Sequence, residues 1–122
     1  MYSDKQSSGK HLLLDAKEIK NADLLGSLAM TEALFDGICS KYGFTILQKC
    51  RHEFEPQGFS LVYLLAESHM SVHTFPEKAY AAIDVYTCKE YADNRVYEEI
   101  HRVLVEAYGA DLNPAVIVDR LF

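Results

Sequence analysis

The middle of the chain contains three apolar, extended stretches that follow one another with only a few residues between them. They are Phe59–Ala66, Met70–Phe75 and Tyr80–Cys88, and they are rich in aliphatic, β-branched and aromatic residues, a composition typical of strands. Parallel neighbours need a crossover of a dozen or more residues, whereas antiparallel neighbours can be joined by a short turn. The three stretches therefore predict an antiparallel sheet at the centre of the fold.

Two segments on either side of this region carry apolar residues at helical spacing. The first is Asp23–Lys41, and the second has its apolar stripe at Val96, Ile100, Val103, Leu104 and Ala107. The flanking residues fit helix ends, with Asn21 or Asp23 and Asp93 or Asn94 as candidate N-caps and Gly43 and Gly109 as stops. Both segments are predicted to be helices.

The rest of the chain adds extended segments. His11–Ala16 and Phe44–Phe54 are predicted strands, Glu55–Gly58 is a predicted turn, and Pro114–Phe122 is compatible with a last strand or with irregular chain. The order β-α-β-β-β-β-α indicates an α+β fold, a two-layer sandwich in which a mainly antiparallel sheet has two helices packed on one face. The other face of the sheet needs a partner, and homo-oligomerisation is the simplest one.

Length and apolar content favour a single domain. The chain has 122 residues, of which 49% are hydrophobic, and so short a chain is expected to build one core across residues 1–122. No apolar run approaches the roughly 18–20 residues that span a bilayer. Met1–Lys10 lacks the apolar centre of a secretion signal. We therefore expect a cytoplasmic protein that does not associate with membranes.

Charge and cysteine content exclude further classes. The net charge is −6 and the Lys and Arg residues are scattered, whereas nucleic-acid binding needs a basic stripe. The cysteines are Cys39, Cys50 and Cys88. An odd number without a close pair argues against a disulfide framework and against a Cys-x-x-Cys metal site. Neither a nucleic-acid partner nor a bound metal is predicted.

Polar residues interrupt the central apolar region at Glu67–His69. Ser60, His73 and Cys88 lie near the edges of neighbouring predicted strands, where a hydroxyl, an imidazole and a thiol could converge for covalent chemistry. Each of these residues alone is more often structural than catalytic. Zinc binding by His69, His73 and Cys88 is also conceivable. However, the two histidines are four residues apart on an extended segment, which places their imidazoles two pleats apart, too far for one ion without a bend.

Three segments resemble a known family. Ala66–Cys88, AESHMSVHTFPEKAYAAIDVYTC, resembles the signature of the short bacterial and archaeal S-adenosylmethionine decarboxylases, with its Glu-Ser-His, His-Thr, Pro-Glu and Thr-Cys elements. Gly9–Asp15 and His52–Ser60 resemble the family's opening strand and its His-x-Phe-x-Pro-x-Gly-x-Ser segment. The three matches occur in the family's order and together extend over most of the chain.

The resemblance implies that the chain is a proenzyme that cleaves itself between Glu67 and Ser68. The hydroxyl of Ser68 would attack the Glu67 carbonyl, and elimination followed by hydrolysis would turn Ser68 into a pyruvoyl cofactor. Matching positions suggest His73 as the base for the elimination and Ser60 as a hydrogen-bonding partner of the intermediate. The products would be a β chain, residues 1–67, and an α chain, residues 68–122.

The resemblance also implies a mature site, placed by the family at a dimer interface between processed αβ units. The pyruvoyl ketone would hold the substrate amine as a Schiff base during decarboxylation. Cys88 matches the proton donor, Phe54 and Phe75 match rings that stack on adenine, and Glu77 matches a carboxylate that binds ribose. The implied reaction is the decarboxylation of S-adenosylmethionine for spermidine and other polyamine biosynthesis.

Two positions depart from the family pattern. Leu61 follows Ser60, and Lys89 follows Cys88, where the family commonly has glycine. We expect both changes to affect the shape of the pocket more than cofactor formation. Related enzymes act on arginine or ornithine, so either amino acid is the alternative substrate for the same fold and cofactor. An inactive regulatory partner of another decarboxylase is the third possibility, against which the intact Glu67, Ser68, His73 and Cys88 weigh.

Overall fold

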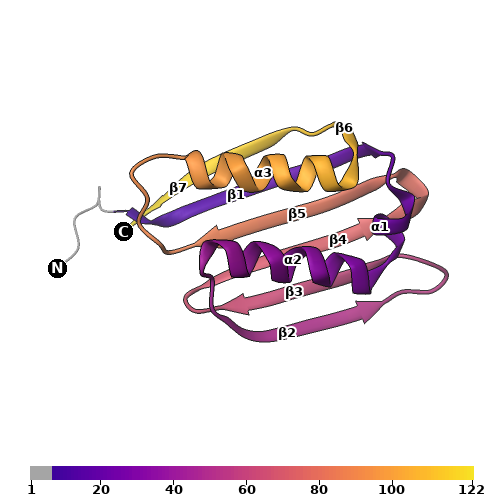
Figure 1. Cartoon of the computed structure of the whole chain (residues 1–122), viewed down its shortest axis with the longest axis horizontal. Helices are drawn as coiled ribbons and strands as arrows, with labels where there is room; N and C mark the ends of the chain where they lie inside the picture. The colour runs from indigo at the N-terminus through magenta and orange to yellow at the C-terminus, as the bar shows by residue number, and fades with distance from the viewer. Residues whose placement is uncertain (1–6) are drawn as a thin grey trace.

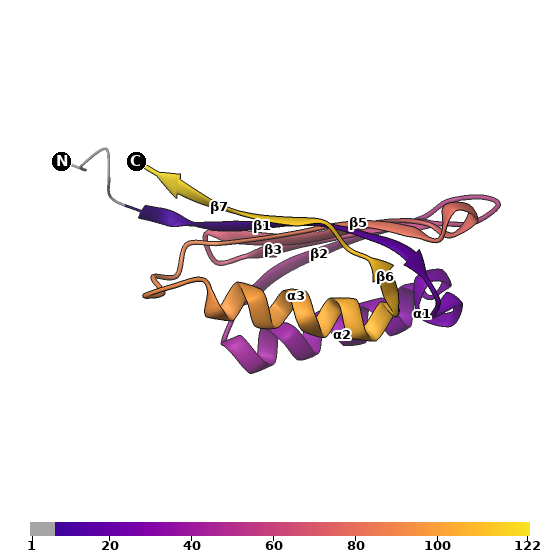
Figure 2. The ribbon, with the colours of Figure 1, turned by 90° about the horizontal axis from the view of Figure 1, so that it is seen from above.

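The computed structural model of the chain describes residues 7–122, which form one seven-stranded antiparallel sheet with all of its helices on one side (Figures 1 and 2). The strands are β1 (Ser7–Ile19), β2 (Ile46–Glu53), β3 (Phe59–Leu65), β4 (Ser68–Phe75), β5 (Tyr80–Thr87), β6 (Ala110–Leu112) and β7 (Ala115–Leu121). The helices are α1 (Ala22–Gly26), α2 (Leu28–Tyr42) and α3 (Arg95–Tyr108), with a short 3₁₀ turn at Pro76–Lys78. The predicted α+β two-layer sandwich is confirmed.

The sheet has the strand order β2-β3-β4-β5-β1-β6, and β7 pairs with β1. The predicted central strands lie side by side and antiparallel, as their short connections require. β1 is longer than the predicted His11–Ala16. One part of it pairs with β7 and its end pairs with β6. The tail Pro114–Phe122, for which strand and irregular chain were both open, forms the strand β7, whereas β6 lies before the tail and was not predicted.

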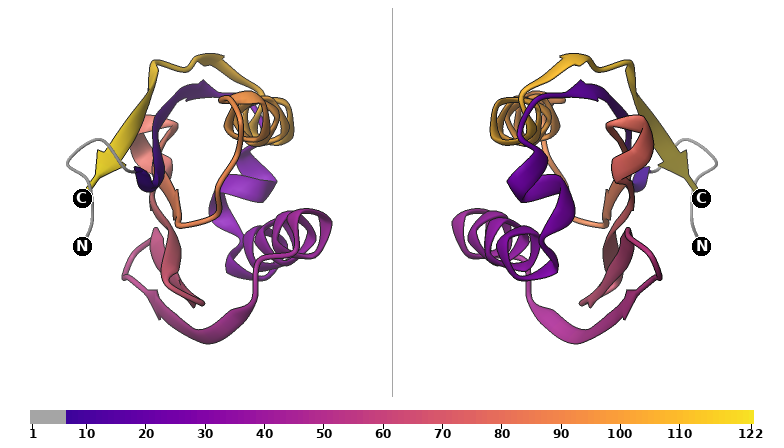
Figure 3. Two further views of the ribbon diagram at one scale, coloured as in Figure 1. Left: turned by 90° about the vertical axis from the view of Figure 1, so that its left-hand side faces the viewer. Right: turned by 90° about the vertical axis from the view of Figure 1, so that its right-hand side faces the viewer.

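The core lies between the sheet and the helices, which the end-on views of Figure 3 show as separate layers. In each central strand every second side chain points into it, as the burial pattern of β3 illustrates, with Leu61 and Tyr63 fully buried and Val62 and Leu64 exposed. Phe35 of α2 and Ile100 and Leu104 of α3 pack against this side and are also fully buried. We call this side of the sheet the helix face.

The first predicted helix is in fact two helices, which corrects the prediction of one helix over Asp23–Lys41. The side chain of Ser27 accepts a hydrogen bond from the Met30 N–H and starts α2, while α1 has already ended. Asn21, rather than Asp23, caps α1 by accepting from the Leu24 N–H. A serine side chain that accepts a hydrogen bond from a backbone N–H of the first turn favours such a cap over continued helix. α2 then ends at Gly43, which has a φ of 70°.

Within residues 7–122 no helix covers the opposite side of the sheet, which we call the open face. Directly paired residues share a face, so the register places the following side chains there: His11, Leu13, Ser60, Val62, Leu64, His69, Ser71, His73, Asp84, Tyr86, Val116 and Val118. Several large apolar members are exposed, including Leu64 at 49% and Val116 at 57%. No helix within residues 7–122 is long and apolar enough to cross a membrane.

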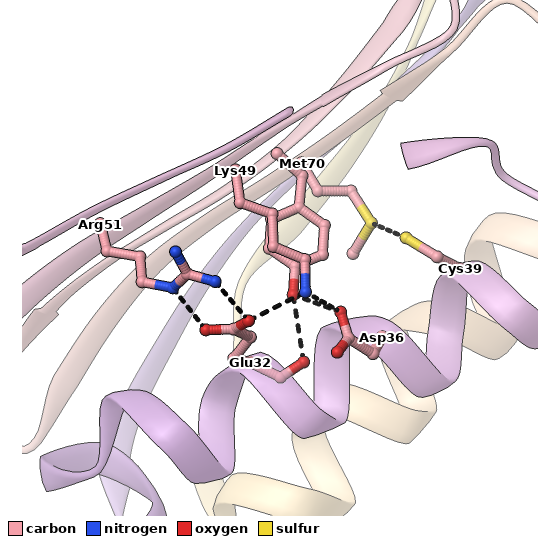
Figure 4. Close-up of polar contacts among 7 residues, drawn as sticks. Glu32, Asp36, Cys39, Lys49, Arg51 and Met70 are labelled. Atoms are coloured by element: carbon pink, nitrogen blue, oxygen red, sulfur yellow. Dashed lines mark hydrogen bonds and ion pairs between the residues drawn. The ribbon is translucent and has the colours of Figure 1, made fainter. Parts of the chain in front are cut away.

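A charged cluster fastens α2 to the edge strand β2 on the helix face (Figure 4). The guanidinium of Arg51 donates two hydrogen bonds to the Glu32 carboxylate, at 2.6 and 2.7 Å, and the Lys49 ammonium lies 2.9 Å from both Glu32 and Asp36. The Tyr63 hydroxyl donates to Asp36. Hydrogen bonds from Arg51 and then Lys49 lower the pKa of the Glu32 carboxyl to about 2.

Glu32→Gln should lower the free energy of unfolding by about 1 kcal/mol at pH 7, because the variant loses the partner of two cations in a network that fixes α2. The pKa of Glu32 lies below its ordinary value of 4.5, so the carboxylate stabilises the fold above that pH and loses its effect as pH falls toward 2. Urea unfolding of both proteins should show the difference narrowing between pH 4.5 and 2. Glu106→Gln, at an exposed position of α3, is the control and should change stability by less than about 0.5 kcal/mol.

Candidate active site

The turn between β3 and β4 contains the predicted cleavage bond. Leu65 pairs with Ser68, so Ala66 and Glu67 form a two-residue turn. The φ of Glu67 is 57°, in the left-handed region that disfavours residues with a Cβ. Ser68 and His69 belong to β4 and do not interrupt the sheet as the sequence suggested. Local backbone strain therefore sits directly before the serine.

Ser68 lies beside Cys88, at the end of the sheet where β5 stops. The backbone N–H of Cys88 donates to the Ser68 Oγ at 3.0 Å. The Cys88 Sγ lies 3.6 Å from a Glu67 carboxylate oxygen and 3.9 Å from the Ala66 carbonyl oxygen. Because Ser68 Oγ accepts this hydrogen bond, its own hydrogen is available for transfer. We call Glu67, Ser68 and Cys88 the cleavage group.

Ser60 and His73 form a second group, on the open face. They are direct partners in the β3–β4 ladder, and the Ser60 Oγ lies 2.6 Å from the His73 Nδ1. The contact is a short side-chain hydrogen bond, in which the hydroxyl donates when the Nδ1 carries no proton. A hydroxyl paired with an imidazole in this way can exchange a proton with a bound group.

Next to this pair is a cavity of about 380 Å³. Its lining includes Phe54, Phe75 and Glu77, together with Ser60 and His73. Phe54 and Phe75 remain 50% and 40% exposed, so each ring has a free surface. One face of Phe75 is stacked on Tyr80, with ring centroids 5.5 Å apart. These five lining residues are called the pocket group.

A single chain does not bring the two groups together. Ser68 is the first residue of β4 and His73 lies five positions further along it, which corresponds to roughly 17 Å of extended strand. An odd separation also places the two side chains on opposite faces. Convergence of the hydroxyl, imidazole and thiol in one place, considered from the sequence, therefore does not occur within one chain.

A further polar cluster on the open face was not anticipated from the sequence. Asp84 Oδ2 lies 2.9 Å from His11 Nε2 and 3.4 Å from His69 Nε2, and Ser71 donates to the other carboxylate oxygen. Burial raises the pKa of Asp84, but hydrogen bonds from Ser71 and His11 outweigh it, so this pKa lies below its usual value. The sequence signal that could have revealed this cluster is strand alternation, which places His11 of β1, His69 and Ser71 of β4 and Asp84 of β5 on the same face.

The two imidazoles and the carboxylate could hold a metal by their placement, since their ligand atoms all lie within 4.8 Å of one another. Arg120 contacts this cluster, with its Nη1 3.3 Å from the His11 Nδ1. A guanidinium so close repels a cation. For Arg120 to donate to Nδ1, the proton of the neutral His11 ring must be on Nε2, and a protonated Nε2 cannot bind a metal. The geometry therefore favours a hydrogen-bonded network.

Leu61, one of the two departures from the family pattern, has no part in either group. Its side chain is fully buried on the helix face, whereas Ser60 points to the open face. The expectation that this residue alters the pocket is wrong, because neighbouring residues in a strand point to opposite sides. Lys89, the other departure, directly follows the cleavage group.

Comparisons with known proteins find relatives of the chain in both sequence and structure. A family model described as S-adenosylmethionine decarboxylase matches residues 10–119. The S-adenosylmethionine decarboxylase proenzyme of Prochlorococcus marinus (strain MIT 9313) is 38% identical over 102 residues, which cover 84% of this chain and 78% of that protein. Proenzyme 2 of Halalkalibacterium halodurans is 38% identical over 88 residues, covering 72% of this chain and 68% of that protein.

A solved structure has the same fold. The crystal structure of the adenosylmethionine decarboxylase from Aquifex aeolicus VF5 matches with a TM-score of 0.83 and 26% sequence identity, over 96% of this chain and 93% of that one. Sequence and structure therefore agree over nearly the whole length of the described residues. The chain belongs to the S-adenosylmethionine decarboxylase family.

Proposed function

We propose that the chain is the proenzyme of a pyruvoyl-dependent carboxy-lyase that decarboxylates S-adenosylmethionine in polyamine biosynthesis, after cleaving itself between Glu67 and Ser68. The observation that carries the proposal is the cleavage group. A serine hydroxyl with its hydrogen available follows a residue held at a φ of 57°, and the thiol of Cys88 lies against the same turn. No residue outside this chain is needed to supply the nucleophile.

Self-cleavage would start when Ser68 Oγ attacks the Glu67 carbonyl carbon. The Ser68 hydroxyl proton passes to the departing Ser68 nitrogen, the C–N bond breaks, and an ester links the two residues. Removal of the Ser68 Cα proton then breaks the ester C–O bond and releases the Glu67 carboxylate. Hydrolysis of the remaining dehydroalanine releases ammonia and leaves the pyruvoyl group. Breaking the turn relieves the left-handed conformation at Glu67, which favours the forward direction.

The base for the elimination, His73, lies far from Ser68 in its own chain, so we place the complete site between two copies. In this dimer the two open faces pack against each other, and the two-fold axis lies between them, perpendicular to β4. The axis makes β4 of one copy run in the opposite direction to β4 of the other. It would lay the Ser60–His73 pair of one copy over the Ser68 end of β4 in the other, and by symmetry the reverse. The Ser68 hydroxyl points to the helix face, so the partner's imidazole would approach the Ser68 Cα proton from the opposite side of the strand. The exposed apolar residues of the open face, such as Leu64 and Val116, would be buried in the same contact. The functional unit is thus a homodimer with two shared sites.

The mature site would combine both groups. The pyruvoyl group supplies a carbonyl that takes up the substrate's amine and withdraws the electron pair left by CO₂. Cys88, as the thiol nearest this position, would donate the proton that replaces the carboxylate. The pocket group would hold the nucleoside, with adenine against Phe54 and Phe75 and the ribose hydroxyls on Glu77.

The pocket supports S-adenosylmethionine over arginine or ornithine as substrate. Neither amino acid has an aromatic ring, so neither would use the free faces of Phe54 and Phe75. A regulatory partner without activity would not need the cleavage group. Decarboxylation measured side by side on the processed protein should therefore proceed with S-adenosylmethionine. Turnover of arginine or ornithine alone would contradict the substrate, and no turnover at all would contradict the activity.

Phe54→Ala should raise KM for S-adenosylmethionine by about fivefold, because one stacked aromatic contributes on the order of 1 kcal/mol. Self-cleavage should be unchanged, since Phe54 is not in the cleavage group. Leu112→Ala is the matched control. Leu112 is as exposed as Phe54, 49% against 50%, but lies in β6 at the other edge of the sheet. An unaltered KM in Phe54→Ala would place the adenine elsewhere.

A further inference from the structure

Lys89 reaches from the residue after Cys88 to the end of α2. Its Nζ donates hydrogen bonds to the carbonyl oxygens of Tyr42 and Gly43, at 3.0 and 3.1 Å, and lies 5.7 Å from the ring centroid of Phe44. The last carbonyls of a helix lack partners within the helix and carry partial negative charge, so they favour an ammonium group. Among described residues other than glycine, positive φ occurs only at Glu18, Glu67 and Ala79, so the backbone at 89 does not require a glycine.

The same segment of chain also holds the turn that contains the cleavage bond. The N–H of Ala66 donates to the carbonyl oxygen of Thr45 at 3.0 Å. The end of α2, the β3–β4 turn and the end of β5 all lie at one end of the molecule, on the left in Figure 1. Residues 42–45 thus contact two chain neighbours of the cleavage group, Ala66 directly before Glu67 and Lys89 directly after Cys88.

Cys88 itself is weakly held by its side chain. It lies one residue beyond the last residue of β5, outside the strand ladder, and its Sγ makes only long contacts of 3.6 and 3.9 Å. Its backbone N–H is bonded to the Ser68 Oγ, an atom that the proposed maturation removes from this position. After maturation, Thr87 still holds the chain before Cys88 through the β1–β5 ladder and its 2.6 Å hydrogen bond with Tyr97. The contacts of Lys89 hold the chain directly after Cys88.

We infer that Lys89 is a positioning residue, which fixes Cys88 against the reacting carbon by fastening the following backbone to the end of α2. The inference rests on the proposed role of Cys88 as proton donor. A proton passes from Sγ to carbon only when the two are close and aligned, and a displacement near 1 Å is enough to slow such a step. Substrate binding uses the pocket group, which Lys89 does not contact. Loss of Lys89 should therefore affect kcat and spare KM.

Lys89→Met should lower kcat by about tenfold for S-adenosylmethionine, with KM within about twofold of the parent and self-cleavage complete. Lys89→Arg, which can donate to both carbonyls, should restore most of kcat. Lys89→Gln, with one uncharged donor group, should be intermediate. Steady-state kinetics and gel analysis of cleavage provide these values. Unchanged kcat in Lys89→Met, a rise in KM that matches the fall in kcat, or failure of Lys89→Arg to restore activity would overturn the inference.

Lys41→Met is the matched control. Lys41 is also a cation in the last turn of α2, with its Nζ 5.4 Å from the Tyr42 ring centroid, and it has no contact with the cleavage group. Lys41→Met should lose about as much thermal stability as Lys89→Met while keeping the kcat of the parent. A fall in kcat equal to that of Lys89→Met would show a general effect of the helix end and overturn the positioning role. Cys88→Ala separates the two proposals. Normal turnover there would refute the proton donor itself, whereas an inactive Cys88→Ala beside a fully active Lys89→Met would refute only the role of Lys89.

Discussion

Ser68→Ala is expected to remain a single chain of 122 residues under conditions in which the parent protein is fully cleaved. The variant keeps the β3–β4 turn and the left-handed Glu67 but has no oxygen to attack the carbonyl, so the acyl shift cannot begin. Denaturing gels and intact mass should show two fragments for the parent and one for the variant. The second fragment of the parent should resist Edman sequencing because it begins with a ketone.

Ser71→Ala is the control for this prediction. Ser71 lies on the same strand, three positions away, and its hydroxyl is bonded to Asp84 rather than to the cleavage group. It should cleave itself at Glu67–Ser68 as the parent does. Persistent cleavage at this bond in Ser68→Ala would remove the basis of the proposed cofactor, and with it the proposed mechanism.

The central strands β3, β4 and β5 and the helix α3 could be predicted from the sequence because their apolar patterns are strong and local. Phe59–Leu65 alternates between buried and exposed side chains along its whole length, and α3 has four buried residues on one stripe. The break at Ser27 was missed because a single side-chain cap starts α2 within a segment whose apolar spacing continues. The charged cluster around Glu32 could not be foreseen, because it joins α2 to β2 through contacts set only by the packing of the layers.

The residues of the candidate site could be identified from their resemblance to a family, but their grouping depended on the register of the sheet. The pairing of Ser60 with His73 follows from the β3–β4 turn, and the meeting of Ser68 with Cys88 follows from the β4–β5 register. The separation of Ser68 and His73 could nevertheless have been inferred from the sequence. Positions 68 and 73 are separated by an odd number, so a continuous strand must place them on opposite faces.

The proposed sharing of each site between two chains leads to the second large effect, which concerns mixed dimers. Ser68→Ala and His73→Ala should each remain uncleaved when produced alone. In a mixed dimer, one site combines both defects, whereas the other combines the intact Ser68 of the His73→Ala chain with the intact His73 of its partner. Only the His73→Ala chain should then be cleaved. With random pairing, about half of the chains are in mixed dimers, so about half of the His73→Ala chains should be processed.

The experiment uses two chains that carry different affinity tags and are produced together, so that each fragment is assigned by its tag and mass. The control pair is His73→Ala with Ser60→Ala. These two residues belong to the same group and lie 2.6 Å apart, so every site in that mixed dimer contains one defect and no chain should be cleaved. Ser68→Ala with Ser60→Ala should behave like the first pair, with cleavage confined to the Ser60→Ala chain. Cleavage of neither chain in the first pair would place the site within one chain. It would then require β4 to rearrange before the reaction, since its extended form holds Ser68 and His73 roughly 17 Å apart.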